Sequence, residues 1–230
     1  MKKLFSIALL AVAAHAYAGS CDQFYPYGKP TLPKGNYVEL CRKDYVVIYD
    51  NDKKIPFLTY EHLTPETIGR GQVERGAFRV DKDVAPQYRA GPKDYAGNKR
   101  FDKGHFANAQ NAMDDEAMDQ RDLYSNAVPQ VYTFNRGSWK VLESNVAKAV
   151  RRGADLYVVT GAVTASNETI GNGVVIPTEL AKAVIDKKTG GQVIYIMPNE
   201  TNNKSYRDFK ASRAMLDSKL GTDITPQLPR

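Results

Sequence analysis

A single amphipathic helix between two groups of apolar strands constrains the fold of this chain more than any other feature. Three short strand-like runs come first, at Tyr37–Leu40, Tyr45–Tyr49 and Phe57–His62. Apolar residues then recur at helical spacing over Trp139–Arg152, and Gly153 is well placed to end that helix. The helix therefore separates an early meander of strands from whatever follows.

More strands follow the helix. Leu156–Thr160 is a strongly apolar, β-branched run that stops at Gly161, and Asp186–Gly191 is typical of a hairpin turn. The remaining predicted elements are strands at Val174–Ile176, Ala181–Ile185 and Val193–Met197 and a short helix at Tyr206–Leu216. Strands, one central helix and strands again predict an α+β fold on a mostly antiparallel sheet. Residues 64–100 are polar without clear periodicity, which is typical of a functional segment.

The first residues have the three regions of a secretory signal peptide. Met1–Lys3 is positively charged, Leu4–Ala14 is apolar except for Ser6, and Ala16–Ala18 has the small-x-small form of a cleavage site. The apolar stretch is too short to anchor the chain in a bilayer. We expect cleavage after Ala18, one domain over residues 19–230, no membrane association after cleavage, and a secreted or periplasmic protein.

Cys21 and Cys41 are the only cysteines. Because export places them in an oxidising compartment, we expect a disulfide, and two free thiols are the alternative. A bond closing that loop stabilises the fold by about 3 kcal/mol on the chain-entropy estimate.

The charge balance favours polyanionic partners. The formal net charge is +6, from 32 basic and 26 acidic residues, and it is +4 without Lys2 and Lys3. A modest positive charge is common, so the charge permits nucleic-acid binding without establishing it.

Few residues are available for metal or nucleophilic chemistry. Beyond residue 18 the histidines are His62 and His105, which are too few for the usual nitrogen and sulfur ligands of zinc. The sequence has no G-x-S-x-G nucleophile elbow. An enzyme of this composition is expected to use an oxygen-ligated metal.

Three separate motifs stand out: DKGH ending at His105, SNAVPQ containing Asn126, and NRGSWKVLE from Asn135 to Glu143. Together they resemble the motifs of the DNA/RNA non-specific endonucleases, which have the ββα-metal fold. The successive intervals from His105 to Asn126, from Asn126 to Asn135 and from Asn135 to Glu143 are 21, 9 and 8 residues. The likeness runs from about Leu58 to the C-terminus. Any one motif alone would be weak, but together they are specific.

The resemblance implies an endonuclease that cuts DNA and RNA without sequence specificity and leaves 5′-phosphate ends. It implies that His105 is the general base and that Asn135 holds Mg²⁺, with Mn²⁺ as a second candidate. Asn126 would orient His105 or the phosphate. On a continuous helix Glu143 would lie about 12 Å and 80° from Asn135, which suits a contact to metal-bound water.

The cationic positions depart from the family pattern or are ambiguous. The family usually has Arg where this chain has Lys103, and Lys cannot make a two-pronged phosphate contact. In the family, an arginine that stabilises the transition state precedes a Phe/Trp-x-x-Asp element. Phe78–Asp81 matches that element here. Arg75 is our assignment, with Arg70 and Arg79 as rivals.

Plain structural roles compete with the catalytic ones. His105 could be a core histidine, Asn126 and Asn135 turn or cap residues, and Glu143, Lys103 and Arg75 solvated surface charges. Trp139 is expected to be a core anchor rather than a base-stacking platform, and His62 to be structural. Asp102 could support the loop that carries His105. A polar loop is expected at Asn108, Asn111, Asp114, Asp115 and Glu116.

Three functions fit these residues. The first is the nuclease, bound to DNA and RNA through the phosphate backbone. The second is a catalytically silent nucleic-acid-binding protein of the same fold, and the third is a phosphodiesterase acting on small nucleotides.

Overall fold

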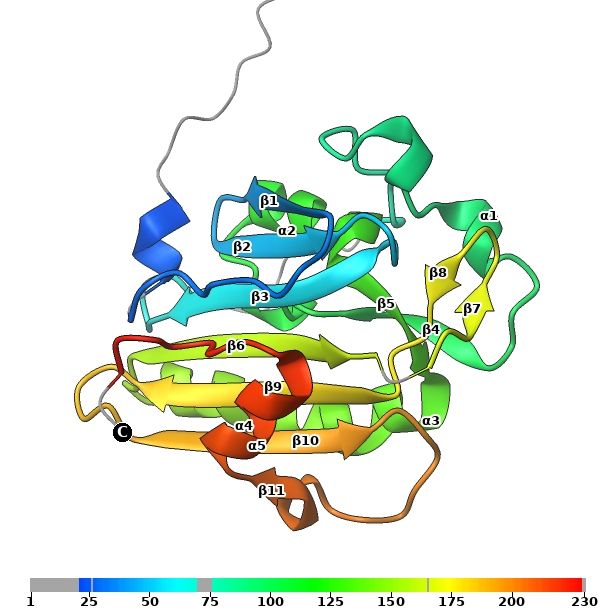
Figure 1. The fold of residues 1–230 in the computed structure, drawn as a ribbon. Coiled ribbons are helices and arrows are strands. Elements are labelled where there is room, and N and C mark those ends of the chain that lie inside the picture. Colours follow the sequence, from blue (N-terminus) through cyan, green and yellow to red (C-terminus); the bar gives the residue numbers. More distant parts are fainter. Residues whose placement is uncertain (1–20, 26, 70–75, 165, 229–230) are drawn as a thin grey trace, which may run out of the picture.

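A computed structural model describes residues 21–25, 27–69, 76–164 and 166–228. A seven-stranded sheet forms the centre of the molecule (Figure 1). All of its neighbouring strands pair antiparallel, which confirms the predicted sheet type. In spatial order the strands are β1 (Tyr37–Cys41), β2 (Tyr45–Asp50), β3 (Ile55–Leu63), β6 (Leu156–Val163), β9 (Glu179–Asp186), β10 (Gln192–Pro198) and β11 (Lys210–Ala211).

The strand at Leu156 is longer than predicted. β6 continues through Gly161, which pairs with Leu58 on β3 and with Ala181 on β9. A Cβ at this glycine would lie 3.2 Å from side-chain atoms of Leu58 and Leu220. The glycine therefore makes room for a neighbouring helix and does not end the strand.

The C-terminal helix also differs from its prediction over Tyr206–Leu216. The structure has a 3₁₀ turn at Tyr206–Phe209, then β11, and only then helix α5 (Arg213–Leu220). Ser212 caps this helix by accepting a hydrogen bond from the Met215 amide, and Gly221 ends it at φ 68°. The helix thus begins after its cap at Ser212 and ends at Gly221, so it starts later in the chain than the apolar pattern predicted.

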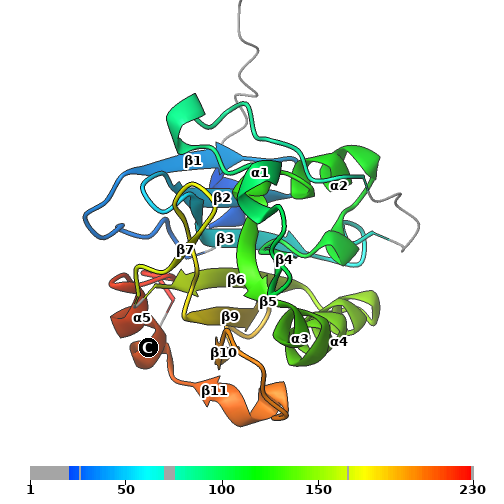
Figure 2. The same cartoon turned by 90° about the vertical axis from the view of Figure 1, so that its right-hand side faces the viewer.

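The two faces of the sheet carry separate apolar cores. Helix α4 (Lys140–Arg151) and helix α5 lie on opposite faces (Figure 2). Leu142, Val146 and Val150 of α4 pack against one face, and Leu216 and Leu220 of α5 against the other. Trp139 is fully buried in the α4 core, as predicted for an anchor.

The predicted disulfide is present. Cys21 lies in a 3₁₀ turn at Cys21–Phe24 and is bonded to Cys41 at the end of β1. The bond fastens the N-terminal end of the described chain to the edge of the sheet.

A pair of strands and the helical segment that follows them, which ends in α4, form a ββα unit next to the sheet. Strand β4 (Phe101–His105) pairs antiparallel with β5 (Ala127–Val131), and helix α2 (Asp115–Arg121) lies in the connection between them. Neither strand was predicted from the sequence. The smaller elements are α1 (Pro92–Tyr95), α3 (Tyr132–Phe134), β7 (Thr169–Ile170) and β8 (Val174–Val175).

The central helix is interrupted at its start. The predicted helix over Trp139–Arg152 corresponds to α4, but α3 and a π-helical turn at Asn135–Trp139 precede it. Gly137 in that turn has φ −99° and ψ −117°, outside the helical region. Asn135 and Glu143 therefore do not lie on one continuous α-helix, and the predicted 12 Å and 80° separation does not apply. No described helix is long and apolar enough to cross a membrane.

Candidate active site

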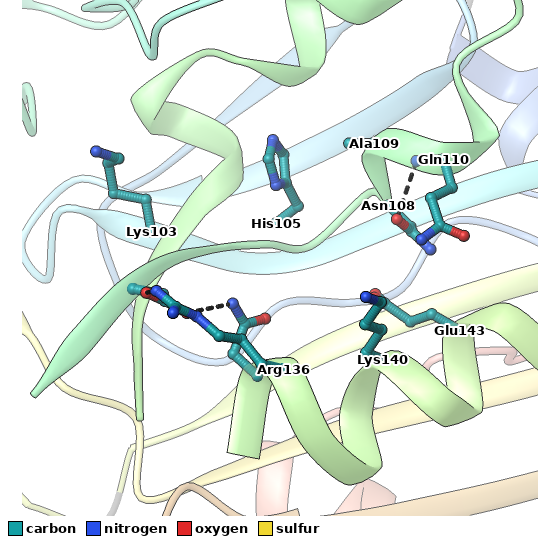
Figure 3. Close-up of a pocket in the computed structure, with 10 residues that line it drawn as sticks. Lys103, His105, Asn108, Ala109, Gln110, Arg136, Lys140 and Glu143 are labelled. Atoms are coloured by element: carbon teal, nitrogen blue, oxygen red, sulfur yellow. Dashed lines mark hydrogen bonds and ion pairs between the residues drawn. The ribbon is translucent and has the colours of Figure 1, made fainter. Parts of the chain in front are cut away.

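A pocket of about 410 Å³ lies between β4 and the start of α4 (Figure 3). His105 and Lys103 approach it from the strand, and Arg136, Lys140 and Glu143 from the helical segment. Asn135 lines the same pocket. The ββα unit thus brings together four of the sequence-predicted residues, His105, Lys103, Asn135 and Glu143. The pocket is completed by Asp102, Asn108, Ala109 and Gln110.

His105 ends strand β4 and is held by a carboxylate. Its Nε2 lies 2.8 Å from Oδ1 of Asp122, and the Asp122 side chain is only 3% exposed. The Phe78 ring packs against the imidazole at 4.6 Å between centroids. The histidine is therefore fixed by polar and apolar contacts on different sides.

Asp102 links the strand to the helical turn. Its carboxylate accepts a hydrogen bond from Asn135 Nδ2 at 3.0 Å and two from Arg136, at 2.8 and 2.6 Å. Partial burial opposes ionisation, but the hydrogen bonds from Arg136 and Asn135 outweigh it and lower the pKa of Asp102. Because the Asn135 amide donates through its nitrogen, its oxygen is the atom left to act as a ligand. Asp102 thus orients Asn135, whereas from the sequence we expected it to support the loop that carries His105.

Glu143 lies on α4 above a buried lysine. Burial raises the pKa of Glu143 to about 7, the charge of Glu61 adds to the rise, and the Lys182 ammonium opposes it. Lys182 is 2% exposed, and its Nζ lies 3.5 Å from Glu143 Oε1 and 2.8 Å from Thr160 Oγ1. The Trp139 ring lies 4.8 Å from the same ammonium. Glu143 is thus a shielded carboxylate with a cation beneath it, not a solvated helix-face residue.

Three cations face the pocket. Lys103 is exposed, and its ammonium lies 5.5 Å from the Phe78 ring centre. Arg136 is 70% exposed although it is paired with Asp102, and Lys140 follows one turn later. Cations that are exposed around a cavity are suited to bind phosphate groups.

Gly104 allows β4 to approach its partner strand closely. A Cβ at this position would lie 1.9 Å from Oε1 of Gln130 and 2.7 Å from its Cβ. Gln130 is fully buried on β5. The glycine of the DKGH motif is therefore required by packing beside the residue that carries the imidazole.

Asn126 does not line the pocket, contrary to a role in contacting phosphate. It is fully buried, its Oδ1 accepts from the Ala107 amide at 2.8 Å, and its Nδ2 donates to the carbonyls of Ala107 and Arg121, both at 3.0 Å. Ala107 is two residues beyond His105, so Asn126 shapes the backbone that follows the imidazole. The physical reason is that its amide is engaged by the backbone and has no route to a substrate.

The predicted transition-state arginine is only partly described. Arg75 and Arg70 lie outside the described residues. Their rival Arg79 does not line the pocket, because its guanidinium donates to the Asp119 carbonyl at 2.8 Å and lies 3.3 Å from the Asp119 carboxylate.

The residues present fit a largely hydrated divalent cation. Among the described residues no group of three or more His, Cys, Asp and Glu side chains is placed to hold a metal. Mg²⁺ keeps several waters and needs only one or two protein oxygens. The Asn135 amide can supply one, and the Glu143 carboxylate lies in the same pocket. Glu143 Oε1 is buried and is paired with Lys182 at 3.5 Å without a hydrogen bond, so it can still accept one from a water of such an ion.

Of the remaining sequence predictions, the one for His62 agrees with the structure and the one for the polar loop is partly wrong. His62 lies outside the pocket, bonded to Asp155 at 2.6 Å and stacked on Tyr157, which agrees with a structural role. The polar loop expected after the DKGH motif is partly wrong, because Asp114 caps helix α2 and Asn108 lines the pocket. The cap bond from the Ala117 amide to Asp114 explains why a helix forms there.

Three functional candidates were missed from the sequence. A lysine in the middle of the apolar run at Ala181–Ile185 was a visible signal for Lys182, and Arg136 directly follows Asn135. Asp122 gave no signal, because its approach to His105 depends on where α2 ends in space.

Comparisons with known proteins agree with this geometry. A family model described as DNA/RNA non-specific endonuclease matches residues 24–230. The chain is 34% identical to human mitochondrial endonuclease G over 190 residues, which is 75% of this chain and 62% of that protein. It is 32% identical to nuclease C1 of Cunninghamella echinulata var. echinulata, over 69% of this chain and 70% of that protein.

The fold matches a solved structure closely. A crystal structure of an EndoG/EndoGI complex superposes with a TM-score of 0.83 and 27% identity, covering 94% of this chain and 95% of that chain. The family match and the fold extend over nearly the whole described chain, and the two sequence matches cover 75% and 69% of the chain. This protein therefore belongs to the DNA/RNA non-specific endonuclease family.

Proposed function

We propose that the protein is a divalent-metal-dependent endonuclease that hydrolyses phosphodiester bonds in DNA and RNA without sequence specificity. The observation that carries the proposal is the pocket shared by His105, Asn135 and Glu143 and bordered by cations. Family membership and the nuclease relatives support the same chemistry.

In the proposed reaction His105 is the general base. Its unprotonated ring nitrogen takes a proton from water, and the water oxygen attacks phosphorus in line. The bond from phosphorus to the 3′ oxygen breaks, and that oxygen leaves with the electron pair and gains a proton from solvent. The products are a 5′-phosphate and a 3′-hydroxyl.

Asn135 would hold the metal through its amide oxygen, and Glu143 would hold waters of the ion. A bound Mg²⁺, or Mn²⁺ in its place, stabilises negative charge on the phosphate oxygens and on the leaving oxygen. Asp102 keeps the Asn135 side chain turned so that its oxygen can reach the ion.

Lys103, Arg136 and Lys140 would contact the phosphates along the backbone of the nucleic acid. Such contacts carry no base information, so binding would be independent of sequence and weakened by salt. Arg75 stays the proposed source of further charge at the transition state.

We also propose that the protein is exported and acts in the periplasm or outside the cell, because the first 18 residues have the pattern of a signal peptide. N-terminal sequencing of the protein recovered from the periplasm and from the medium tests this. A mature protein that starts at Gly19 is the expected result, and an intact Met1 would contradict it.

Digestion of plasmid DNA and of RNA, with Mg²⁺ and then with EDTA, tests the function. We expect cleavage of both polymers, its loss with EDTA, and a fall of at least about 10²-fold for His105→Ala. His62→Gln is the matched control, because that histidine lies outside the pocket. Binding of both polymers without cleavage would instead support the catalytically silent alternative.

A further inference from the structure

We propose that Asp122 is a positioning residue for the general base, holding the His105 ring in the tautomer and orientation that let it take a proton from water. The inference rests on the proposed nuclease function, because it assigns a partner to the histidine of that reaction. Asp122 belongs to none of the motifs that mark the family in this sequence.

The carboxylate is fixed in place by its own backbone. Asp122 directly follows helix α2, its amide donates to the Met118 carbonyl at 2.9 Å, and its carbonyl accepts from the Arg79 amide at 2.8 Å. With the side chain 3% exposed, its Oδ1 lies 2.8 Å from His105 Nε2. A buried carboxylate held on both sides of its Cα defines one direction for the ring nitrogen.

An aromatic ring limits the remaining freedom of the imidazole. Phe78 packs on His105 at 4.6 Å between centroids with planes tilted by 38°, and Phe78 in turn contacts Tyr124. The hydrogen bond fixes one edge of the imidazole and the stacked ring covers one face. The ring is therefore set before any substrate arrives.

The chemistry of this contact assigns the tautomer. An ionised carboxylate only accepts hydrogen bonds, so the neutral imidazole carries its proton on Nε2 and its lone pair on Nδ1. After His105 has taken a proton from water, the adjacent negative charge also stabilises the imidazolium. Asp122 thus contributes both before and after the proton moves.

Charged groups around the pocket come from two further elements. Asp102 and Lys103 lie on β4, and Arg136, Lys140 and Glu143 come from the helical segment. A substitution at Asp122 leaves all five unchanged, so a change in the pH profile reports the His105–Asp122 contact.

Asp122→Asn tests the inference, since it keeps the shape and removes the charge. An amide can offer its NH₂ to Nε2, which moves the imidazole proton to Nδ1. We expect kcat to fall by at least about 10²-fold with little change in KM. The residual activity should have its acidic limb at lower pH, because the imidazolium has lost its counter-charge. Asp115→Asn, an exposed residue of the same helix with the same charge change, should behave like the unaltered protein.

Nitrogen NMR of the unaltered protein gives a readout that needs no variant to fold. Beyond residue 18 the histidines are His62 and His105, so assignment through His105→Gln and His62→Gln is direct. We expect the Nε2–H tautomer at His105, and a mixture or the other tautomer in Asp122→Asn. An Nδ1–H tautomer in the unaltered protein would overturn the inference.

The two proposals fail in different ways. If the unaltered protein cleaves neither DNA nor RNA, the proposed function fails while the tautomer measurement still stands. The other outcome is that the unaltered protein cleaves, that His105→Ala is inactive, and that Asp122→Asn keeps the unaltered rate and pH profile. That outcome refutes only the role of Asp122.

Discussion

At the scale of single residues, the polar side chains around the pocket are of two kinds. Some line the cavity, and others lie behind it and contact the lining side chains. His105, Asn135 and Glu143 face the cavity, whereas Asp122 and Lys182 lie behind it. The residues behind the cavity are nearly inaccessible to solvent, so solvent and salt screen their charges less than those of exposed residues. Substitutions at either layer should therefore have measurable and distinct effects.

Glu143 makes the stability of the metal-free protein depend on pH. Its pKa is raised from 4.5 to about 7, so the folded state binds a proton more tightly than the unfolded state. The resulting stabilisation is fully present below about pH 4.5 and is lost as the pH rises through 7. The free energy of unfolding relative to Glu143→Gln should fall by up to about 3 kcal/mol across this window.

Urea denaturation in EDTA from pH 4.5 to 8 measures this difference. Glu200→Gln is the control for loss of one carboxylate, because Glu200 is exposed. A difference between the unaltered protein and Glu143→Gln that stays constant with pH would contradict the role of burial at this carboxyl.

At the scale of elements, the hairpin of β4 and β5 positions the imidazole, and one tight contact holds it together. Gly104→Ala would place a methyl group against Gln130, at 1.9 Å from its Oε1. We expect a loss of about 1–3 kcal/mol of stability, the usual cost of overpacking, together with reduced activity. Urea denaturation and plasmid cleavage measure the two effects.

A double substitution identifies the cause of that loss. Gly104→Ala combined with Gln130→Gly, which removes the whole side chain that would clash, should be less destabilised than the sum of the single changes, by more than about 0.5 kcal/mol. Gly91→Ala is the control, since its backbone is extended and its Cβ would make an ordinary contact at 3.4 Å to Val80. Simple additivity at Gly104 and Gln130 would argue against the steric explanation.

The element predictions from sequence succeeded where a periodic apolar pattern coincided with a stable element. Six of the seven strands of the large sheet and helix α4 have such patterns and were located, whereas β11 lies in the segment predicted as a helix. β4 was missed because D-K-G-H has no alternation, and its stability comes from pairing with β5. The start of α4 was located to within one residue, but the helical turns before it were not predicted, and Gly137 interrupts them with φ −99° and ψ −117°.

At the scale of the whole molecule, the disulfide fastens the N-terminal segment to the sheet on the face that carries α5. Replacing Cys21 and Cys41 by Ser should lower the free energy of unfolding by about 3 kcal/mol, because the unfolded chain regains the freedom of the closed loop. Thermal and urea unfolding measure this change.

The same variant should cleave plasmid DNA at an unchanged rate while it is folded, because neither cysteine lines the pocket. Reduction of the disulfide in the unaltered protein should cause the same loss of stability as the substitution of both cysteines. A fall in kcat at a temperature where the variant is fully folded would show that the N-terminal segment communicates with the site.

The sequence by itself determined the antiparallel α+β architecture, the paired cysteines and the identity of His105, Asn135 and Glu143 as pocket residues. The architecture follows from periodicity, the disulfide from two cysteines behind an export signal, and the pocket residues from motifs that resemble those of the endonuclease family. Only the tertiary structure decided that Asn126 faces the backbone of Ala107, that Lys182 lies under Glu143 and that Asp122 holds His105. The partners in these contacts lie 19, 39 and 17 residues apart, so they meet only after the sheet, hairpin and helices have packed.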